Sequence, residues 1–274
     1  MRISPVSLII LLSLPFQILD ADDWPQWFGP EGDGVWRETG ILAKFPDGGP
    51  HVLWRTPIRR GYAGPSVSGQ KVYIMDRMVD RSPEARRESA RTGAQPGNER
   101  LLCLDVGTGK TLWQESYPAS YTMSYPAGPR ATPLVDGMRV YTLGAEGLLA
   151  CRSTKDGQLL WGHDFKKRYQ IKTQTWGFAA SPLIHGKHLI CLAGGDGSTA
   201  VAFDKVTGKE AWRALDAGQP GYCAPRIVKY SGRDLLIIWH PESVNALDPS
   251  TGKLFWTIPW KIRFGLTIPV PQMI

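Results

Sequence analysis

The side chains best suited to bind a ligand lie in short links that precede Gly-Pro, Thr-Pro, Ser-Pro or Ala-Pro steps. They are Tyr62, Tyr125, Arg130, Trp176 and Tyr222. The same links hold Phe178, and a similar link before Ile268-Pro269 holds Phe264. Aromatic rings stack on flat molecules, and a guanidinium pairs with an anionic group. If the fold brings these links together, they would form a site for a flat anionic ligand. The alternative left open by the sequence is that the rings simply fill the centre of the fold.

A second chemical pattern, G-T-G-K-T at residues 107–111, resembles the end of a phosphate-binding loop. That motif needs a glycine five residues before its Gly-Lys step, and the residue there is Leu104. Related segments follow Gly-Lys with Glu210 or Leu254 instead of Ser or Thr. The pattern therefore does not predict nucleotide binding.

Cysteine and histidine spacings predict no metal site, because the sequence has no C-x-x-C and His185 and His188 lack a third ligand. Cys103 and Cys151 sit at equivalent places in apolar runs, where thiols behave as small hydrophobes. A disulfide involving one of the other two, Cys191 or Cys223, stays open. No nucleophile elbow, paired-carboxylate signature or metalloprotease motif is present, so no catalytic residue is predicted.

A repeated ten-residue pattern must position these side chains. It reads L-D-V-G-T-G-K-T-L-W at residues 104–113 and recurs at 203–212 and 247–256, with a looser copy at 152–161. Its Asp can bond forward to backbone N–H groups, and the Gly four residues later supplies positive φ for a tight turn. Each copy therefore predicts strand, turn and strand, with a tryptophan on the second strand.

The spacing of these tryptophans, about 45–60 residues, is typical of four-stranded propeller blades. Many of the predicted strands are continuously apolar, as expected where blades cover both faces of a sheet. We therefore predict an all-β fold, a β-propeller of four-stranded blades. The predicted blades span about residues 62–118, 125–166, 176–216 and 222–260, with the start of another at 264–274.

The chain begins with an apolar stretch typical of a secretory signal peptide, over residues 1–21. No later run is long enough to span a membrane, and no cysteine near it could carry a lipid. We therefore predict a periplasmic or secreted protein without a transmembrane segment after signal removal.

Residues 22–50 predict an irregular cap, because they are rich in Trp, Pro and Gly and show neither strand nor helix periodicity.

The opening W-P-Q-W at residues 24–27 and the Asp-x-x-Thr-Gly-Lys-x-x-Trp copies resemble exported bacterial PQQ-like β-propeller repeat proteins. The resemblance covers the predicted mature chain, 22–274. It implies that the repeat tryptophans dock between blades: Trp54, Trp113, Trp161, Trp212 and Trp256. It also implies seven or eight blades in a complete ring, of which about four are present. Residues 51–58 would then be a closing strand, and the sequence a C-terminally truncated fragment lacking roughly 130–180 residues.

The repeats are similar to those of quinoprotein alcohol dehydrogenases and of the outer-membrane assembly lipoprotein. Similarity to the dehydrogenases would imply PQQ and calcium in the channel, yet their adjacent cysteine pair has no counterpart here, and no position matches their calcium ligands. We therefore predict a noncatalytic scaffold that binds a protein or small-molecule ligand at the channel face. The alternative is a PQQ-dependent dehydrogenase whose decisive residues lie outside this sequence.

Charge patterning adds two expectations. The formal net charge of +7 is scattered, and its densest piece, Lys166, Lys167, Arg168 and Lys172, reads as a solvated loop, so no nucleic-acid partner is predicted. Residues 76–100 carry many charges of both signs and predict a mobile loop between two strands. Their arginines could meet an acidic partner, or the segment could be an ordinary solvated loop.

Overall fold

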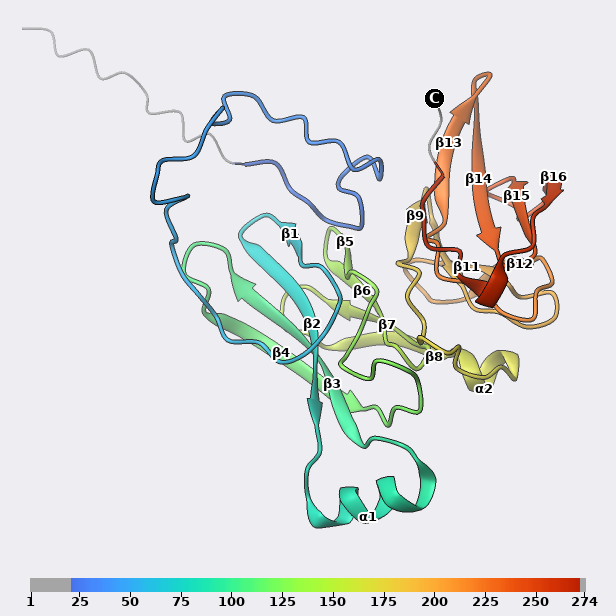
Figure 1. Ribbon diagram of the computed structural model, residues 1–274. Coiled ribbons are helices and arrows are strands. Elements are labelled where there is room, and N and C mark those ends of the chain that lie inside the picture. Colours follow the sequence, from blue (N-terminus) through green and yellow to red (C-terminus); the bar gives the residue numbers. More distant parts are fainter. Residues whose placement is uncertain (1–20, 272–274) are drawn as a thin grey trace, which may run out of the picture.

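The chain folds into four consecutive antiparallel sheets of four strands each, which confirms the predicted all-β propeller architecture (Figure 1). The structure, a computed structural model, describes residues 21–271, so the predicted signal peptide lies outside the described residues except for Ala21. No helix within these residues has the length and apolar character that crossing a membrane requires.

Strands within each blade follow one another in sequence order. The first blade comprises β1 (Ser66–Ser68), β2 (Lys71–Val79), β3 (Gly97–Asp105) and β4 (Thr111–Pro118). The second comprises β5 (Leu134–Asp136), β6 (Arg139–Leu143), β7 (Leu148–Ser153) and β8 (Leu159–Asp164). The third comprises β9 (Leu183–His185), β10 (His188–Leu192), β11 (Ala200–Asp204) and β12 (Glu210–Ala214). The fourth comprises β13 (Arg226–Tyr230), β14 (Arg233–His240), β15 (Ser243–Leu247) and β16 (Leu254–Pro259).

The turn between the third and fourth strands of a blade follows from its Asp and Gly. In the first blade, Asp105 Oδ1 accepts from the backbone N–H and the hydroxyl of Thr108, and the Gly109 N–H donates to Asp105 O at 2.8 Å. Gly109 has φ +67°, a conformation that strains residues with a Cβ. The two hydrogen bonds from Thr108 hold the pKa of the Asp105 carboxyl below its usual value. The chain therefore reverses within a few residues.

In the first three blades, the tryptophan of the fourth strand lies on the turn of the next blade. Trp113 Nε1 donates to Thr154 O, and Trp212 Nε1 donates to Pro249 O, each at 3.2 Å. Trp54 makes the same contact with the first blade, donating to Val106 O at 2.8 Å. A Cβ on the turn glycine would collide with the indole, for example 2.7 Å from Trp113 at Gly157. Each indole thus depends on a glycine of the neighbouring blade.

Two tryptophans depart from this pattern. Trp161 packs on Gly208, but the equivalent carbonyl, Lys205 O, accepts from the Tyr141 hydroxyl instead. Its indole N–H has no acceptor among the described residues. Trp256 lies on β16 of the fourth blade and is 40% exposed, whereas Trp212 is 9% exposed. The tryptophan at this repeat position is therefore covered by the following blade in Trp212 and partly exposed to solvent in Trp256.

The hydrophobic core lies between blades more than within them. One cluster joins Tyr141 and Leu149 of the second blade to Leu189 and Phe203 of the third. Others join the first blade to the second and the third to the fourth.

All four cysteines are free and buried, which answers the disulfide question left open by the sequence. Burial raises the pKa of the Cys151 thiol to about 12, so it is an unreactive hydrophobe.

Residues 76–100 differ from the predicted loop between two strands. β2 and β3 stay paired from Lys71 and Asp105 out to Val79 and Gly97, and helix α1 (Pro83–Thr92) closes the resulting arm (Figure 1). Ser82 caps the helix by accepting from the Ala85 N–H, and Pro83 occupies the first turn. The mixed charges thus belong to a long hairpin and a capped helix.

Two other segments also differ from expectation. Residues 51–58, predicted as a closing strand, form no strand, although Trp54 lies against the first blade. The basic run expected to be a solvated loop mostly forms helix α2 (Phe165–Tyr169). In it, Lys166 pairs with Glu146 at 2.5 Å and Arg168 with Glu210 at 2.8 Å. A 3-10 turn (Arg263–Gly265) follows β16.

Candidate functional site

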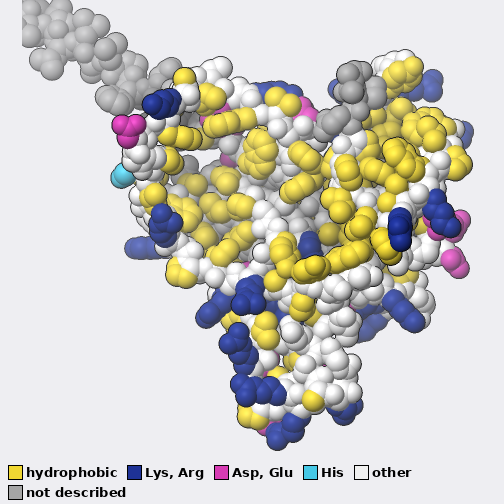
Figure 2. Space-filling model, in the orientation of Figure 1, with side chains coloured by type: hydrophobic (Ala, Val, Ile, Leu, Met, Phe, Trp, Pro, Cys, Tyr) yellow, Lys and Arg dark blue, Asp and Glu magenta, His cyan; other side chains and the backbone are white. Residues whose placement is uncertain are grey.

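One central cavity of about 570 Å³ is lined by all five residues singled out above: Tyr62, Tyr125, Arg130, Trp176 and Tyr222. The links before all four blades contribute, and so do Trp27 of the cap and Leu266, Ile268 and Val270 after the fourth blade. Apolar side chains also gather on the visible face between the first and last blades (Figure 2). The structure therefore assembles a single aromatic cavity from segments far apart in sequence.

The two phenylalanines of the same links lie elsewhere. Phe178 is buried in the core between the second and third blades. Phe264 lines an adjoining cavity of about 480 Å³, which shares Trp176 with the central one. Sequence position alone did not separate these residues from those of the central cavity. Sequence reasoning missed Trp27, which lies in the cap, and Ile268, which lies in the same predicted link as Phe264.

Arg130 is held at the cavity by backbone carbonyls. Its guanidinium donates to Gly128 O, to Ser124 O at 3.1 Å and to Tyr125 O at 2.6 Å. Tyr125 has φ +52°, an uncommon conformation for a residue with a side chain, and its carbonyl is thereby available to Arg130. The Tyr62 N–H donates to Pro129 O at 2.8 Å, which fixes the neighbouring link. The first two links are therefore built as one unit around this arginine.

The cavity carries a positive charge without a carboxylate beside it. Among the described lining residues, Arg130 is the one charged side chain, and no ion pair joins it to an acid in residues 21–271. Its guanidinium carbon lies 5.2 Å from the ring centre of Tyr62. Burial lowers the pKa of Arg130, although a guanidinium stays charged. The cavity therefore combines apolar walls with one cation available to an anionic group.

The opposite wall is ordered by contacts between the third and fourth links. Trp176 and Tyr222 meet edge to face with ring centres 5.7 Å apart. The Gln174 side chain donates to Gly221 O and accepts from the Gly221 N–H, both at 3.1 Å. The Tyr222 N–H donates to Thr267 Oγ1 at 3.1 Å. Because these bonds fix both rings, the wall is preformed for stacking.

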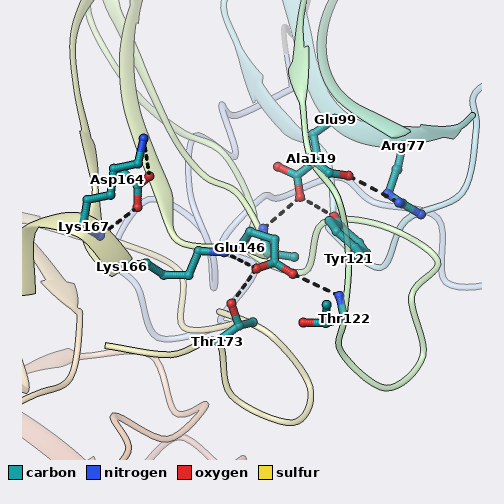
Figure 3. Close-up of polar contacts among 11 residues, drawn as sticks. Arg77, Glu99, Ala119, Tyr121, Thr122, Glu146, Asp164, Lys166, Lys167 and Thr173 are labelled. Carbon is teal, nitrogen blue, oxygen red and sulfur yellow. Dashed lines mark hydrogen bonds and ion pairs between the residues drawn. The ribbon is translucent and has the colours of Figure 1, made fainter. Parts of the chain in front are cut away.

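A buried polar cluster lies behind Arg130, and sequence reasoning missed it. Glu99 is fully buried and accepts from the Tyr121 hydroxyl (Figure 3). It also accepts from the Tyr117 hydroxyl and, at 2.9 Å, from the Ala145 N–H. Arg77 lies over the Tyr121 ring, 3.8 Å from its centre. Loss of water around the carboxyl raises the pKa of Glu99 despite the hydroxyl and N–H donors. The alternation of side chains along a strand could have predicted that Glu99 is buried, because it places Glu99 on the same face as the apolar Leu101 and Cys103.

A second acid ties the second blade to the third. Glu146 accepts from Lys166 Nζ and from the Thr173 hydroxyl, each at 2.5 Å, and from the Thr122 N–H at 3.4 Å (Figure 3). Both partners that lie at 2.5 Å come from the segment that follows β8. Glu146 therefore anchors the approach to the third link and stands outside the cavity lining.

The lining does not fit the PQQ and calcium that the family resemblance implies. Calcium takes six to eight oxygen ligands, chiefly carboxylates, amides and carbonyls. The described lining offers phenol hydroxyls and Ser181 but no carboxylate or carboxamide side chain. Within residues 21–271, no three His, Cys, Asp or Glu side chains group as metal ligands would. We therefore derive no chemical step through a quinone at this cavity.

Comparison with known proteins adds a family match. The family model described as outer membrane protein assembly factor BamB matches residues 97–263, more than half of the chain. No curated protein sequence matches the chain significantly.

Solved structures with a similar fold include propellers with different functions. The quinohemoprotein alcohol dehydrogenase of Comamonas testosteroni aligns over 90% of this chain and 52% of its own, at 16% identity and a TM-score of 0.51. BamB from Moraxella catarrhalis aligns over 75% and 51%, at 19% identity and a TM-score of 0.45. Quinohemoprotein alcohol dehydrogenase ADHIIG from Pseudomonas putida HK5 aligns over 78% and 36%, at 17% identity and a TM-score of 0.48. The chain thus spans about half the length of these structures or less, and the Comamonas alignment shows a shared fold.

Proposed function

Because this chain belongs to the PQQ-like repeat propeller family described as outer membrane protein assembly factor BamB, we propose that it is a noncatalytic binding scaffold. It holds a protein or small-molecule ligand at its central cavity. It is exported to the periplasm or secreted, as the signal-peptide pattern of residues 1–21 predicts.

The observation that carries the proposal is the composition of the cavity. Its walls are aromatic and aliphatic, and Arg130, the one charged side chain of the described lining, favours a ligand with an anionic group. The described lining contains no pair of acid and base and no nucleophile beside a base, which catalysis by side chains would need. Stacking and ion pairing are the interactions that remain, and they suit binding more than turnover.

Site-specific photo-crosslinking in the protein's own cells tests the proposal. A benzophenone amino acid at Tyr125, which is 70% exposed in the cavity, should give a discrete adduct. The same group at Tyr230, which is 60% exposed on β13, is the matched control and should not give it. The adduct should disappear in Arg130→Gln. Equal adducts from both positions, or an adduct indifferent to Arg130, would contradict binding at this cavity.

Dye-linked alcohol oxidation tests the noncatalytic part separately. The purified protein, supplied with PQQ and calcium, should reduce an artificial electron acceptor no faster than a protein-free control. A calcium-dependent rise in rate that follows protein concentration would overturn the scaffold and favour a quinone-dependent dehydrogenase.

A further inference from the structure

A second concave surface lies beside the first blade, where Arg60 pairs with Arg77 of β2, and it shares no lining residue with the central cavity. This arginine groove, of about 610 Å³, is lined by Arg59, Arg60, Arg77 and Arg81 together with the apolar Ile58 and Met78. Lys and Arg side chains gather on the visible face over the far ends of β2 and β3 and the α1 arm (Figure 2). No acidic side chain is among the described residues that line the groove.

The backbone that carries two of these arginines is fixed to β2. The Arg59 N–H donates to Asp76 Oδ2 at 2.6 Å, and the Arg77 N–H donates to Arg60 O at 2.8 Å. Gly128 lies so close to Arg60 that a Cβ there would strike its carbonyl oxygen. The two guanidinium groups are therefore presented by a preformed segment instead of a free loop.

Arg77 takes a different role, because its guanidinium turns inward. It stacks on Tyr121 and donates to Pro126 O at 3.0 Å. The exposed cations of the groove are therefore Arg59, Arg60 and Arg81. Within residues 21–271, none of these three forms an ion pair with a carboxylate.

The carboxylates nearest in sequence are already engaged. Asp76 is fully buried and pairs through both oxygens with Arg100, at 2.8 and 2.6 Å. Asp80 accepts from the Ser82 N–H at 2.8 Å, and Glu84 pairs with Arg87 on α1. Asp80 and Glu88 line a neighbouring cavity, which shares Met78 and Arg81 with the groove. The described lining of the groove itself thus holds three exposed arginines and no carboxylate, which favours an anionic partner.

The apolar residues narrow the choice of partner. Ile58 is 47% exposed and Met78 is 38% exposed, although both lie among cations. A soluble phosphate would leave these side chains in water, whereas a lipid places glycerol and methylene groups beside its phosphate. Arginines attract an anionic membrane surface, and apolar side chains bury into its interfacial region.

We propose that the arginine groove binds the phosphate headgroup of an anionic phospholipid through Arg59, Arg60 and Arg81, with Ile58 and Met78 against its glycerol and first methylene groups. The groove is separate from the central cavity, so this contact would set the orientation of the protein on a membrane surface and leave the cavity free. It does not depend on the function proposed above.

Vesicle co-sedimentation tests the proposal with the whole protein. Vesicles of phosphatidylcholine with about 30% phosphatidylglycerol should bind the protein, and pure phosphatidylcholine vesicles should not. The triple variant Arg59→Gln, Arg60→Gln, Arg81→Gln should bind about a hundred-fold more weakly, since each arginine near such a surface contributes about five-fold. Circular dichroism should show an unchanged fold because all three side chains are exposed.

A matched control removes the same charge elsewhere. Lys110→Gln, Lys209→Gln and Lys253→Gln alter exposed lysines that follow three of the turn glycines, and this variant should bind within about three-fold of the wild type. An equal loss in both triple variants would reduce the effect to net charge and overturn the proposal. So would equal binding to both kinds of vesicle. Calorimetric binding of inorganic phosphate or glycerol phosphate as tight as that of the vesicles would also overturn it and assign the groove to a soluble phosphate.

Discussion

Replacing Trp212 with alanine should cost the fold clearly more free energy of unfolding than replacing Trp256 with alanine. Both residues occupy the fourth strand of a blade at the same place in the repeat. The next blade covers Trp212, which packs on Gly252 and donates to Pro249 O. Trp256 is open on that side. Because both variants lose the same side chain, the difference in stability between them measures the contribution of the contact with the next blade.

The expected difference follows from exposure. Trp212 is 9% exposed and Trp256 is 40% exposed, so about a third of an indole separates them. A tryptophan buries about 150–250 Å², so this share is about 50–80 Å² and is worth about 1–2 kcal/mol at about 25 cal/mol per Å². The hydrogen bond to Pro249 O adds about 1 kcal/mol. Trp212→Ala should therefore be less stable than Trp256→Ala by about 2–3 kcal/mol.

Thermal and urea unfolding, followed by far-UV circular dichroism, measure the difference without relying on tryptophan fluorescence. The midpoint of Trp212→Ala should lie about 4–10 °C below that of Trp256→Ala. Equal midpoints for the two variants, or a lower one for Trp256→Ala, would refute the reasoning that contacts between blades stabilise this fold.

Three further predictions concern buried and turn positions. Glu99→Gln removes a carboxyl whose pKa is raised by burial above its ordinary value of 4.5. Protonated Glu99 favours the folded state, so its contribution to stability is full below about pH 4.5 and is lost as the pH rises through the folded-state pKa. The free energy of unfolding of the variant, measured in urea from about pH 4 to 8, should therefore increase relative to that of the wild type as the pH rises. A difference between the two proteins that stays constant over this pH range would contradict the prediction. Gly157→Ala combines a φ of +78° with a Cβ 2.7 Å from the Trp113 ring, and should lower the unfolding free energy by about 2–4 kcal/mol, whereas Gly137→Ala, also at positive φ but in open space, should cost about 1–2 kcal/mol. Ser82→Ala removes the α1 cap and should speed amide hydrogen exchange in that helix about five-fold, with the blades unaffected; unchanged exchange would show that the cap contributes nothing.

The repeat pattern was enough to predict the blades and the link residues that meet at the centre. The reason is local: each copy has a Gly at positive φ, and in three of the four an Asp accepts from the backbone of the turn. Once the blades are defined, the links before them must converge, and Tyr62 and Tyr222 reach the same cavity although they lie far apart in sequence. Whether these residues bind a ligand stays a prediction.

The rest depends on contacts between segments that no local pattern predicts. Glu99 looked like one more charge in a mixed segment, but β3 turns it inward beneath two tyrosine hydroxyls. Asp76 and Arg100 read as solvated charges, yet they lie directly opposite each other on β2 and β3 and extend the hairpin. Composition predicted an irregular segment because it counts charges without pairing them across strands.

Binding of 8-anilinonaphthalene-1-sulfonate, a flat aromatic anion, tests most directly whether the central cavity is a binding site. The dissociation constant, measured by fluorescence titration, should rise about ten-fold in Arg130→Gln, since hydrogen bonds to a charged group contribute about 1.5–3 kcal/mol. It should change little in Arg213→Gln, which removes an exposed charge from the third blade. An affinity that does not depend on Arg130 would contradict the account.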